Sequence, residues 1–412
     1  MQTQDSRLRD YARLIVELGI NVQPGEPVVI SCPVDGAPFG RLLARFAYER
    51  GASEVVFNWK DDALERLRYD YAPMEIFETV PQWAFDRLKY YYEKGANLIS
   101  VSSEDPELLS GADMKKIAAA SKANNEKMKP LDKYVMSDIL SWCIAAIPNP
   151  AWAKKVFPDA PTEEAAVEQL WEKIFEVTRM NAEDPLAAWQ THIDTLTKRA
   201  DVLNRYHFEK LRYRASNGTD LTVELPRKHV WLAAGAVNAK GTAFLPNVPT
   251  EEVFTVPSRT GVNGTLVSTR PLSYNGNLID HFMLHFENGE VVDFSAETGA
   301  DALQSLFDED PNARRLGEVA LVPHDSPISN SKLLFFNTLF DENASCHFAF
   351  GAAYPTTIEG GERLSEEDLC AEGANDALLH EDFMVGCADL SIQGITADGQ
   401  CIDVFIDGNF AL

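Results

Sequence analysis

The first half of the chain alternates between short apolar runs and longer segments in which apolar residues recur every three or four positions. The short runs are rich in β-branched residues and predict strands at residues 27–32, 54–59, 97–101 and 142–147. The longer segments predict helices at residues 40–50, 62–94 and 111–127. Strands separated by helices of this length form parallel sheets that are covered on both faces. We therefore predict a doubly wound α/β domain.

Two long helical patterns follow, at residues 162–178 and 185–208, and they are expected to bridge to the second half of the chain. Thr162 is a suitable N-cap for the first of them, because its hydroxyl group can accept from a free N–H of the first turn. With these bridging helices, the N-terminal doubly wound parallel-sheet domain is predicted to span residues 1–205.

Beyond these helices the pattern changes to an alternation of apolar and polar positions, which is typical of half-buried strands. Asn-Gly at residues 288–289 and Asp-Gly at residues 398–399 each separate two such runs and predict β-hairpins. Helical spacing returns near residues 299–307 and 328–340. Residues 206–412 are therefore predicted to form a C-terminal antiparallel α+β domain.

The composition narrows the range of partners. The chain has 412 residues, 45% of them hydrophobic, and a formal net charge of -26. Because so acidic a surface repels phosphate groups, we expect neither nucleic acid nor an anionic membrane as a partner. No apolar run approaches the roughly 20 residues that span a bilayer, and the N-terminal segment lacks a secretory pattern.

The cysteines indicate a reducing environment. Six cysteines are scattered along the chain, and none forms a CxxC pair of the zinc-ribbon or thioredoxin type. They are expected to be reduced residues of a cytoplasmic protein. The first half also lacks GxGxxG and GxxxxGK[ST] motifs, so no motif indicates a nucleotide site there.

Two histidines stand in contexts that suit a metal site. His380 and Asp382, in LLHEDFMVG, are two residues apart and would project from the same face of an extended strand. His347 stands in ASCHFAFGAAYP, where small residues let a ligand approach the backbone closely. Imidazole nitrogen and carboxylate oxygen are the donors of hydrolytic zinc and cobalt sites. The alternatives are a solvated acidic turn at His380 and a buried imidazole bonded to a backbone carbonyl at His347.

Three glutamates border apolar strands. Glu251 and Glu252 lead directly into the apolar run of NVPTEEVFTVP, and Glu318 opens the strand of RLGEVALVP. A lone carboxylate in such a strand needs a partner or a metal ion. The alternatives are a capping pair at the first position and a solvated strand end at the second. His281 and His285 also share a strand face, but no carboxylate lies between them on it, so we expect both to be structural.

These segments together carry a resemblance to a known family. NVPTEEVFT, GEVALVP, SCHFAFGAAYP and HEDFMVG, in this order and at these separations, resemble the signature stretches of the M29 metallopeptidases, the family of aminopeptidase T, aminopeptidase S and PepS. LIVELGINVQPGEPVVI is similar to the opening of the same family. The resemblance extends from about residue 10 to the C-terminus.

The resemblance implies two adjacent divalent metal ions held by five side chains, namely Glu252, Glu318, His347, His380 and Asp382. It leaves Glu251 open as an alternative to its neighbour, and it leaves the metal open among zinc, cobalt, manganese and magnesium. Tyr354 matches a tyrosine beside the metals, where its hydroxyl group would donate to a developing oxyanion. Glu251 is the candidate general base.

The resemblance also implies an aminopeptidase that removes N-terminal residues from short peptides with a metal-activated water. Residues 206–412 would then be the catalytic domain, and the protein would be a homodimer whose active sites face an enclosed cavity. Two other interpretations use the same residues: a different dinuclear metallohydrolase, such as a phosphoesterase, and a non-enzymatic ligand-binding protein. A phosphoesterase needs cations beside the ligands, for which Arg259 and Arg270 are the main candidates. A binding module would hold no stoichiometric metal.

Overall fold

The computed structural model describes residues 4–412, and the chain divides into two compact units. The first unit comprises the residues up to Ile193 together with Ala234–Thr250. The second unit comprises Asp194–Ala233 together with Glu251–Leu412. This division differs from the predicted boundary at residues 205/206. The first unit ends within helix α8 (Pro185–Tyr206), and a later segment of the chain returns to it.

The first unit is built on a five-stranded sheet with the order β2-β1-β3-β4-β9, in which all neighbours are parallel. Its strands are β1 (Pro27–Pro33), β2 (Glu54–Lys60), β3 (Asn97–Ser102), β4 (Trp142–Ala146) and β9 (Asn247–Val248). The first four confirm the predicted parallel sheet. Strand β9 was not predicted, because two residues are too few to show a period. The hairpin of β7 (Ala236–Val237) and β8 (Ala243–Phe244) lies in the same returning segment.

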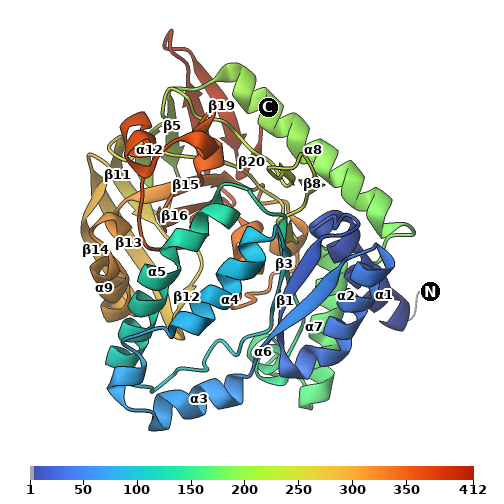
Figure 1. Cartoon of the computed structure of the whole chain (residues 1–412). Coiled ribbons are helices and arrows are strands. Elements are labelled where there is room, and N and C mark those ends of the chain that lie inside the picture. The colour runs from blue at the N-terminus through green and yellow to red at the C-terminus, as the bar shows by residue number, and fades with distance from the viewer. Residues whose placement is uncertain (1–3) are drawn as a thin grey trace. The chain divides into compact units, whose positions relative to one another are not determined.

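Helices cover both faces of this sheet, as the doubly wound prediction requires. In Figure 1, α2 lies on one side of β1 and β3, and α4 and α5 lie on the other. The helices of this unit before α8 are α1 (Gln4–Leu14), α2 (Ala37–Glu49), α3 (Asp62–Tyr71), α4 (Gln82–Glu93), α5 (Met114–Met136), α6 (Pro150–Val156) and α7 (Glu163–Val177). Thr162 is the N-cap of α7, accepting from the N–H of Ala165 at 3.2 Å. Within the described residues, no helix is long and apolar enough to cross a membrane.

The second unit contains a large antiparallel sheet with the order β12-β13-β11-β6-β5-β18-β19-β20, and β14 pairs with β13. Its strands are β5 (Lys210–Arg214), β6 (Asp220–Glu224), β11 (Val262–Val267), β12 (Leu272–Tyr274), β13 (Asn277–Glu287), β14 (Glu290–Thr298), β18 (Ser391–Ile395), β19 (Cys401–Ile406) and β20 (Asn409–Phe410). Both predicted hairpins are present. Asn288 and Gly289 turn β13 into β14 with positive φ angles of 50° and 82°, which is the backbone that an Asn-Gly turn favours.

A smaller antiparallel sheet of the same unit has the order β10-β15-β16-β17. Its strands are β10 (Val253–Thr255), β15 (Leu316–Leu321), β16 (His347–Gly351) and β17 (His380–Met384). Aromatic side chains join it to the large sheet. The ring of Phe383 lies 5.6 Å from Phe282 of β13, and the ring of Phe348 lies 5.2 Å from Tyr213 of β5. The antiparallel α+β prediction is thus confirmed for this unit.

The helix predicted at residues 328–340 is wrong in its extent. Only its ends are helical, as α10 (Pro327–Asn330) and α11 (Thr338–Asp341). Between them Lys332 and Phe336 have positive φ angles of 56° and 53°, which a right-handed helix does not allow. The buried carboxylate of Asp341 accepts from the N–H groups of Phe335 and Asn337 and holds this loop. The other helices of the unit are α9 (Ala300–Glu309) and α12 (Glu366–Glu372).

Asp138, in the first unit, is expected to make stability depend on pH. Burial raises the pKa of its carboxyl group to about 7, although the hydrogen bond donated by Trp142 Nε1 at 3.3 Å acts in the opposite direction. In an unfolded chain the pKa is about 3.9. The folded state therefore holds the extra proton between about pH 4 and pH 7. The free energy of unfolding falls as the pH rises through this window.

The variant Asp138→Asn should remove this pH dependence. Its amide oxygen can still accept from Trp142, and asparagine tolerates the positive φ angle of 49° at this position. We expect the free energy of unfolding at pH 8 to rise by about 1–2 kcal/mol, less than the full pKa shift because the side chain is only partly buried. Urea unfolding at pH 5 and pH 8 gives the free energy of unfolding at each pH. If this free energy changes with pH as much in the variant as in the wild type, the prediction is contradicted.

Candidate metal centre

The pairing register places four of the predicted ligands on one face of the small sheet. Side chains alternate between faces along each strand, and directly opposite residues share a face. Ala349 of β16 lies opposite both Glu318 of β15 and Asp382 of β17. His347 is two residues before Ala349, and His380 is two residues before Asp382. All four polar side chains therefore project from the face that lies away from the buried phenylalanines.

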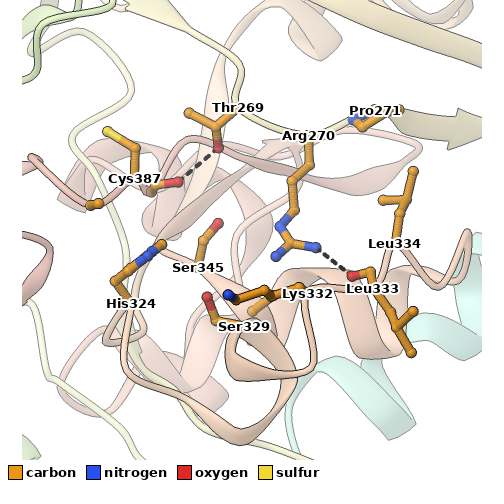
Figure 2. A pocket seen from close by; sticks show the side chains of 13 residues that line it. Thr269, Arg270, Pro271, His324, Ser329, Lys332, Leu333, Leu334, Ser345 and Cys387 are labelled. Atoms are coloured by element: carbon orange, nitrogen blue, oxygen red, sulfur yellow. Dashed lines mark hydrogen bonds between the residues drawn. The ribbon is translucent and has the colours of Figure 1, made fainter.

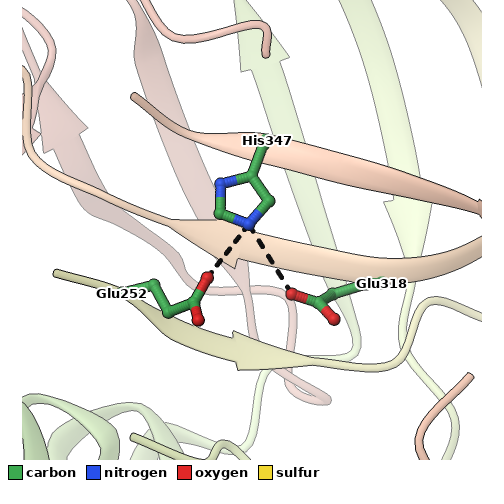
Figure 3. Close-up of side chains that lie close together, drawn as sticks. All are labelled: Glu252, Glu318 and His347. Carbon is green, nitrogen blue, oxygen red and sulfur yellow. Dashed lines mark ion pairs between the residues drawn. The ribbon is translucent and has the colours of Figure 1, made fainter. Parts of the chain in front are cut away.

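These side chains converge with Glu252, which directly precedes β10. Figure 3 shows His347 between two carboxylates: Nε2 lies 3.0 Å from Glu252 Oε2 and 3.7 Å from Glu318 Oε1. His380 Nε2 lies 3.5 Å from Glu318 Oε2 and 3.6 Å from Asp382 Oδ1. The donor atoms form two groups that share Glu318, and within each group they lie within 4.8 Å of one another. The two oxygens of Glu318 thus face different histidines.

Backbone carbonyl groups fix the orientation of both imidazoles. Nδ1 of His347 lies 3.2 Å from the carbonyl oxygen of Ser345, and Nδ1 of His380 lies 2.7 Å from that of Ala352. A carbonyl oxygen only accepts, so each Nδ1 carries the proton and donates it. This arrangement leaves Nε2 as the nitrogen that faces the carboxylates, which is how metal-binding histidines are commonly held.

A glycine makes room for one of these carbonyl groups. Gly317 lies at a register shift between β15 and β16, directly before Glu318. A Cβ atom at this position would collide with the carbonyl oxygen of Ala352, the group that accepts from His380. The close approach of the two backbones therefore requires glycine here.

Burial and mutual charge perturb the pKa of several groups in this cluster. Burial raises the pKa of Glu318 to about 7, although the neighbouring imidazole of His347 acts in the opposite direction. Burial alone would lower the pKa of His347, but the hydrogen bond with Glu252 and the proximity of the Glu318 carboxylate outweigh it and hold the pKa well above the usual range. The charge of Asp382 similarly overcomes burial at His380 and raises its pKa to about 9. The carboxylates thus favour positive charge between them.

Sequence reasoning missed one carboxyl group of this cluster. Glu342 is buried and opens the 3₁₀ turn Glu342–Ala344, close before His347 in the chain. Burial, and after it the charges of Asp382 and Glu252, hold its pKa well above the usual range. Its carboxyl group interacts with that of Asp382. The signal in the sequence was the acidic pair Asp341-Glu342, which directly follows the apolar residues Leu339 and Phe340 at the end of the helix predicted at residues 328–340.

Tyr354 and Glu251 lie differently with respect to the cluster. The ring of Tyr354 stands edge-on to His380 with 5.0 Å between centroids. Burial, and after it the charges of Glu318 and Asp382, hold the pKa of Tyr354 well above the usual range, so its hydroxyl group stays a donor. The backbone N–H of Glu251 donates to Asn343 Oδ1 at 2.7 Å. The carboxylate of the neighbouring Glu252 faces His347, with Oε2 3.0 Å from Nε2.

The donor set fits divalent metal ions. Asp382 Oδ1 is buried and has no hydrogen-bond partner among the described residues, because His380 Nε2 at 3.6 Å is too far for one. Buried carboxylates at this density repel one another unless cations or protons lie between them. Carboxylate oxygens combined with imidazole nitrogens are the ligands that zinc and related transition metals prefer.

Comparison with known proteins gives the family. The profile of the thermophilic metalloprotease (M29) family matches residues 4–410. The chain belongs to the M29 family. Aminopeptidase AmpS of Bacillus subtilis (strain 168) is 48% identical to it over 411 residues, which cover 100% of both chains. Aminopeptidase 2 of Geobacillus stearothermophilus is 47% identical over 100% of this chain and 99% of its own.

A solved structure of an M29 protein shares the whole fold. Wild-type AmpT from Thermus thermophilus is 38% identical and matches 100% of both chains with a TM-score of 0.91. The resemblance found in four sequence segments and the predicted fold class are thereby confirmed. A metallopeptidase family requires a divalent metal cofactor, which agrees with the donor set of the small sheet.

We expect metal ions to stabilise this M29 chain through the cluster. After chelation, added Zn²⁺ should raise the melting temperature, since a ligand at 100 times its Kd that binds only the folded state adds about 2.7 kcal/mol of stability. Asp382→Asn should reduce the shift, because it removes a charged ligand. His281→Ala is the matched control: the His281 side chain is 69% exposed and pairs with Asp280 instead. If Zn²⁺ raises the melting temperature of Asp382→Asn as much as that of the wild type, Asp382 is not a ligand of the metal.

Proposed function

We propose that the chain is a metal-dependent aminopeptidase that removes N-terminal residues from short peptides with two divalent metal ions. The observation that carries the proposal is the position of Glu318, whose two oxygens lie 3.7 and 3.5 Å from two different histidines. A carboxylate between two sets of ligands is suited to bridge metal ions about 3.5–4 Å apart. Glu252 and His347 would complete one set, and His380 and Asp382 the other. The names of the M29 relatives support the reaction class.

The ligands also bear on the identity of the metal. Zinc, cobalt, manganese and magnesium were all open from the sequence. Magnesium prefers oxygen ligands and keeps much of its water, whereas imidazole nitrogen suits the transition metals. Because each proposed set contains one histidine, we expect zinc, cobalt or manganese to bind more tightly than magnesium.

When bound, the metal ions would polarise the scissile carbonyl group and lower the pKa of a bound water. Residues of the chain would stabilise the developing oxyanion and accept the proton from the attacking water. Tyr354, kept protonated beside His380, would donate a hydrogen bond to the oxygen that gains charge. For the proton released by the attacking water, Glu342 is a candidate acceptor beside Glu251, because it lies within the cluster, where the charge of bound metal ions would lower its raised pKa and leave it ionised.

The charge of the loaded site suits a peptide amino terminus better than a phosphate ester. Glu252, Glu318, Glu342 and Asp382 place four carboxyl groups in or beside the donor cluster, and these offset the charge of two divalent ions, so that little positive charge remains to attract an anion. The ion pairs of these ligands among the described residues are formed with His347 and His380, not with arginine or lysine. A phosphate ester would need such cations, so the geometry supports peptides over phosphate esters.

We further propose that the enzyme is a cytoplasmic homodimer. All six cysteines are free, and Cys32, Cys143 and Cys346 are buried, which suits a reducing compartment.

The dimer is supported by exposed aromatic residues. In the first unit, Tyr71 and Trp83 have 81% and 69% of their surface exposed. Large aromatic side chains on the surface are typical of sites where a protein associates. Light scattering of the purified protein tests the dimer.

Removing the proposed bridging charge should abolish turnover. Glu318→Gln keeps the shape of the side chain but removes a negative charge, so we expect kcat/KM for leucyl-p-nitroanilide to fall at least about 100-fold. The wild-type protein should lose activity on chelation and regain it with about two metal ions per chain, measured by metal analysis. Circular dichroism checks that the variant folds.

The other interpretations make different predictions for the same samples. Hydrolysis of p-nitrophenyl phosphate in place of the leucyl substrate would move the assignment to a phosphoesterase. Protein that purifies without metal and shows no metal-dependent hydrolysis would favour a ligand-binding module. Retention of most activity by Glu318→Gln would remove this residue from the site.

Tyr354→Phe should separate catalysis from metal binding. The variant loses only the hydroxyl group that is proposed to donate to the oxyanion, and removal of one such donor commonly lowers kcat about 100- to 1000-fold. Its metal content should equal that of the wild type, because the ring still packs against His380. A normal kcat, or a loss of metal that accompanies the loss of activity, would overturn this role.

A further inference from the structure

The second unit holds a cavity of about 370 Å³ with a cationic lining. Figure 2 shows the side chains of Arg270, Lys332 and His324 turned toward the same space, with the hydroxyl group of Ser329 beside them. No carboxylate is among the described residues that line the cavity. The composition gives no reason for this, since the chain as a whole carries a net charge of -26.

The charges around the cavity do not cancel. One N–H of the Arg270 guanidinium group donates to the carbonyl oxygen of Leu333 at 3.1 Å, and Asp341 lies 3.6 Å away. The buried Asp341 thus offsets the charge of Arg270 and holds its side chain in place, while further N–H donors of the planar group have no hydrogen-bond partner among residues 4–412. Within the described residues, no carboxylate pairs with Lys332. One positive charge therefore remains.

The cavity borders the strands that carry the proposed metal ligands. Ser345 lines it, and the carbonyl oxygen of Ser345 accepts from Nδ1 of His347. Gly386 lines it as well and follows Asp382 by four residues. Since the chain spans at most about 3.6 Å per residue, Ser345 lies no more than roughly 7 Å from His347, and Gly386 no more than roughly 14 Å from Asp382, between Cα atoms. An extended peptide of roughly two to four residues covers the same length.

We propose that this cavity binds a small oxyanion through Lys332, the free donors of Arg270 and the hydroxyl group of Ser329. Carboxylate and phosphate share the chemistry that such donors recognise. Two sources follow: the C-terminal α-carboxylate of a short peptide whose amino end lies at the metal centre, or a free ion such as inorganic phosphate. The first source rests on the proposed aminopeptidase function, and the second does not. Binding of the carboxylate would select peptides by length.

Kinetics with a matched pair of substrates test the first source. The metal-loaded full-length protein is given Leu-Gly-Gly and its C-terminal amide, which differ only in the terminal charge. We expect the wild-type KM for the free acid to be about three- to tenfold below that for the amide, as for one charged hydrogen bond at a partly exposed site. Lys332→Gln should bring the ratio of the two KM values close to one, and Lys332→Glu should reverse it.

Lys198→Gln is the matched control. Lys198 lies exposed on α8 and does not line the cavity, so its substitution changes the net charge equally. The ratio of KM values in this variant should equal that of the wild type. If Lys198→Gln changes the ratio as much as Lys332→Gln does, the effect comes from net charge and the assignment of a carboxylate subsite is overturned.

Calorimetric titration with inorganic phosphate tests the second source without any need for turnover. Phosphate bound at the metal centre would bind equally to the wild type and to Lys332→Gln, whereas phosphate in the cavity would be lost from the variant. Loss of such binding in Lys332→Gln supports the cavity as an oxyanion site even if no peptide is hydrolysed. An equal KM for acid and amide together with equal phosphate binding by both proteins overturns the proposal.

Discussion

The alternation of side chains across the small sheet is the constraint on which the candidate metal centre depends. The rings of Phe350 and Phe383 lie 4.2 Å apart on the face that packs against the large sheet. Successive residues of a strand must point to opposite faces, so the packing that seats these rings also sets Glu318, His347 and Asp382 on the other face. A slip of the register by one residue would exchange the two faces and bury the polar set in the core.

The same burial that orders the cluster also sets its chemistry. Carboxyl groups held together away from water favour protons or cations over their own charge, as the raised pKa values of Glu318 and Glu342 show. Such a cluster destabilises the folded chain, and the surrounding apolar core has to offset this cost. An M29 chain would therefore gain stability from the same ions that it uses in the proposed reaction. Tyr354 shares the environment, which keeps its hydroxyl group a donor.

Sequence reasoning reached elements that have a clear period and residues that belong to a recognisable pattern. The four long strands of the parallel sheet and both hairpins show such periods, and HEDFMVG places His380 and Asp382 on one face without any structure. Other features depend on contacts between distant residues. Glu342 follows α11, which begins only after a loop that interrupts the predicted helix, and Lys332 in that loop has a positive φ angle that no local pattern predicts. Strand β9 pairs with a strand roughly 100 residues earlier, and its two residues carry no period.

The return of residues 234–250 to the first unit affects how the chain folds while it is being made. Strand β4 exposes one edge until β9 leaves the ribosome, and Ile144 finds its carbonyl partner only at Pro246. At about 5–20 residues per second, the roughly 100 intervening residues take on the order of 5–20 s to synthesise. During this time the first two strands of the second unit emerge as well, next to an open sheet edge that can pair with other chains. The order of emergence thus leaves the edge of β4 open to pairing with other chains until β9 has been made.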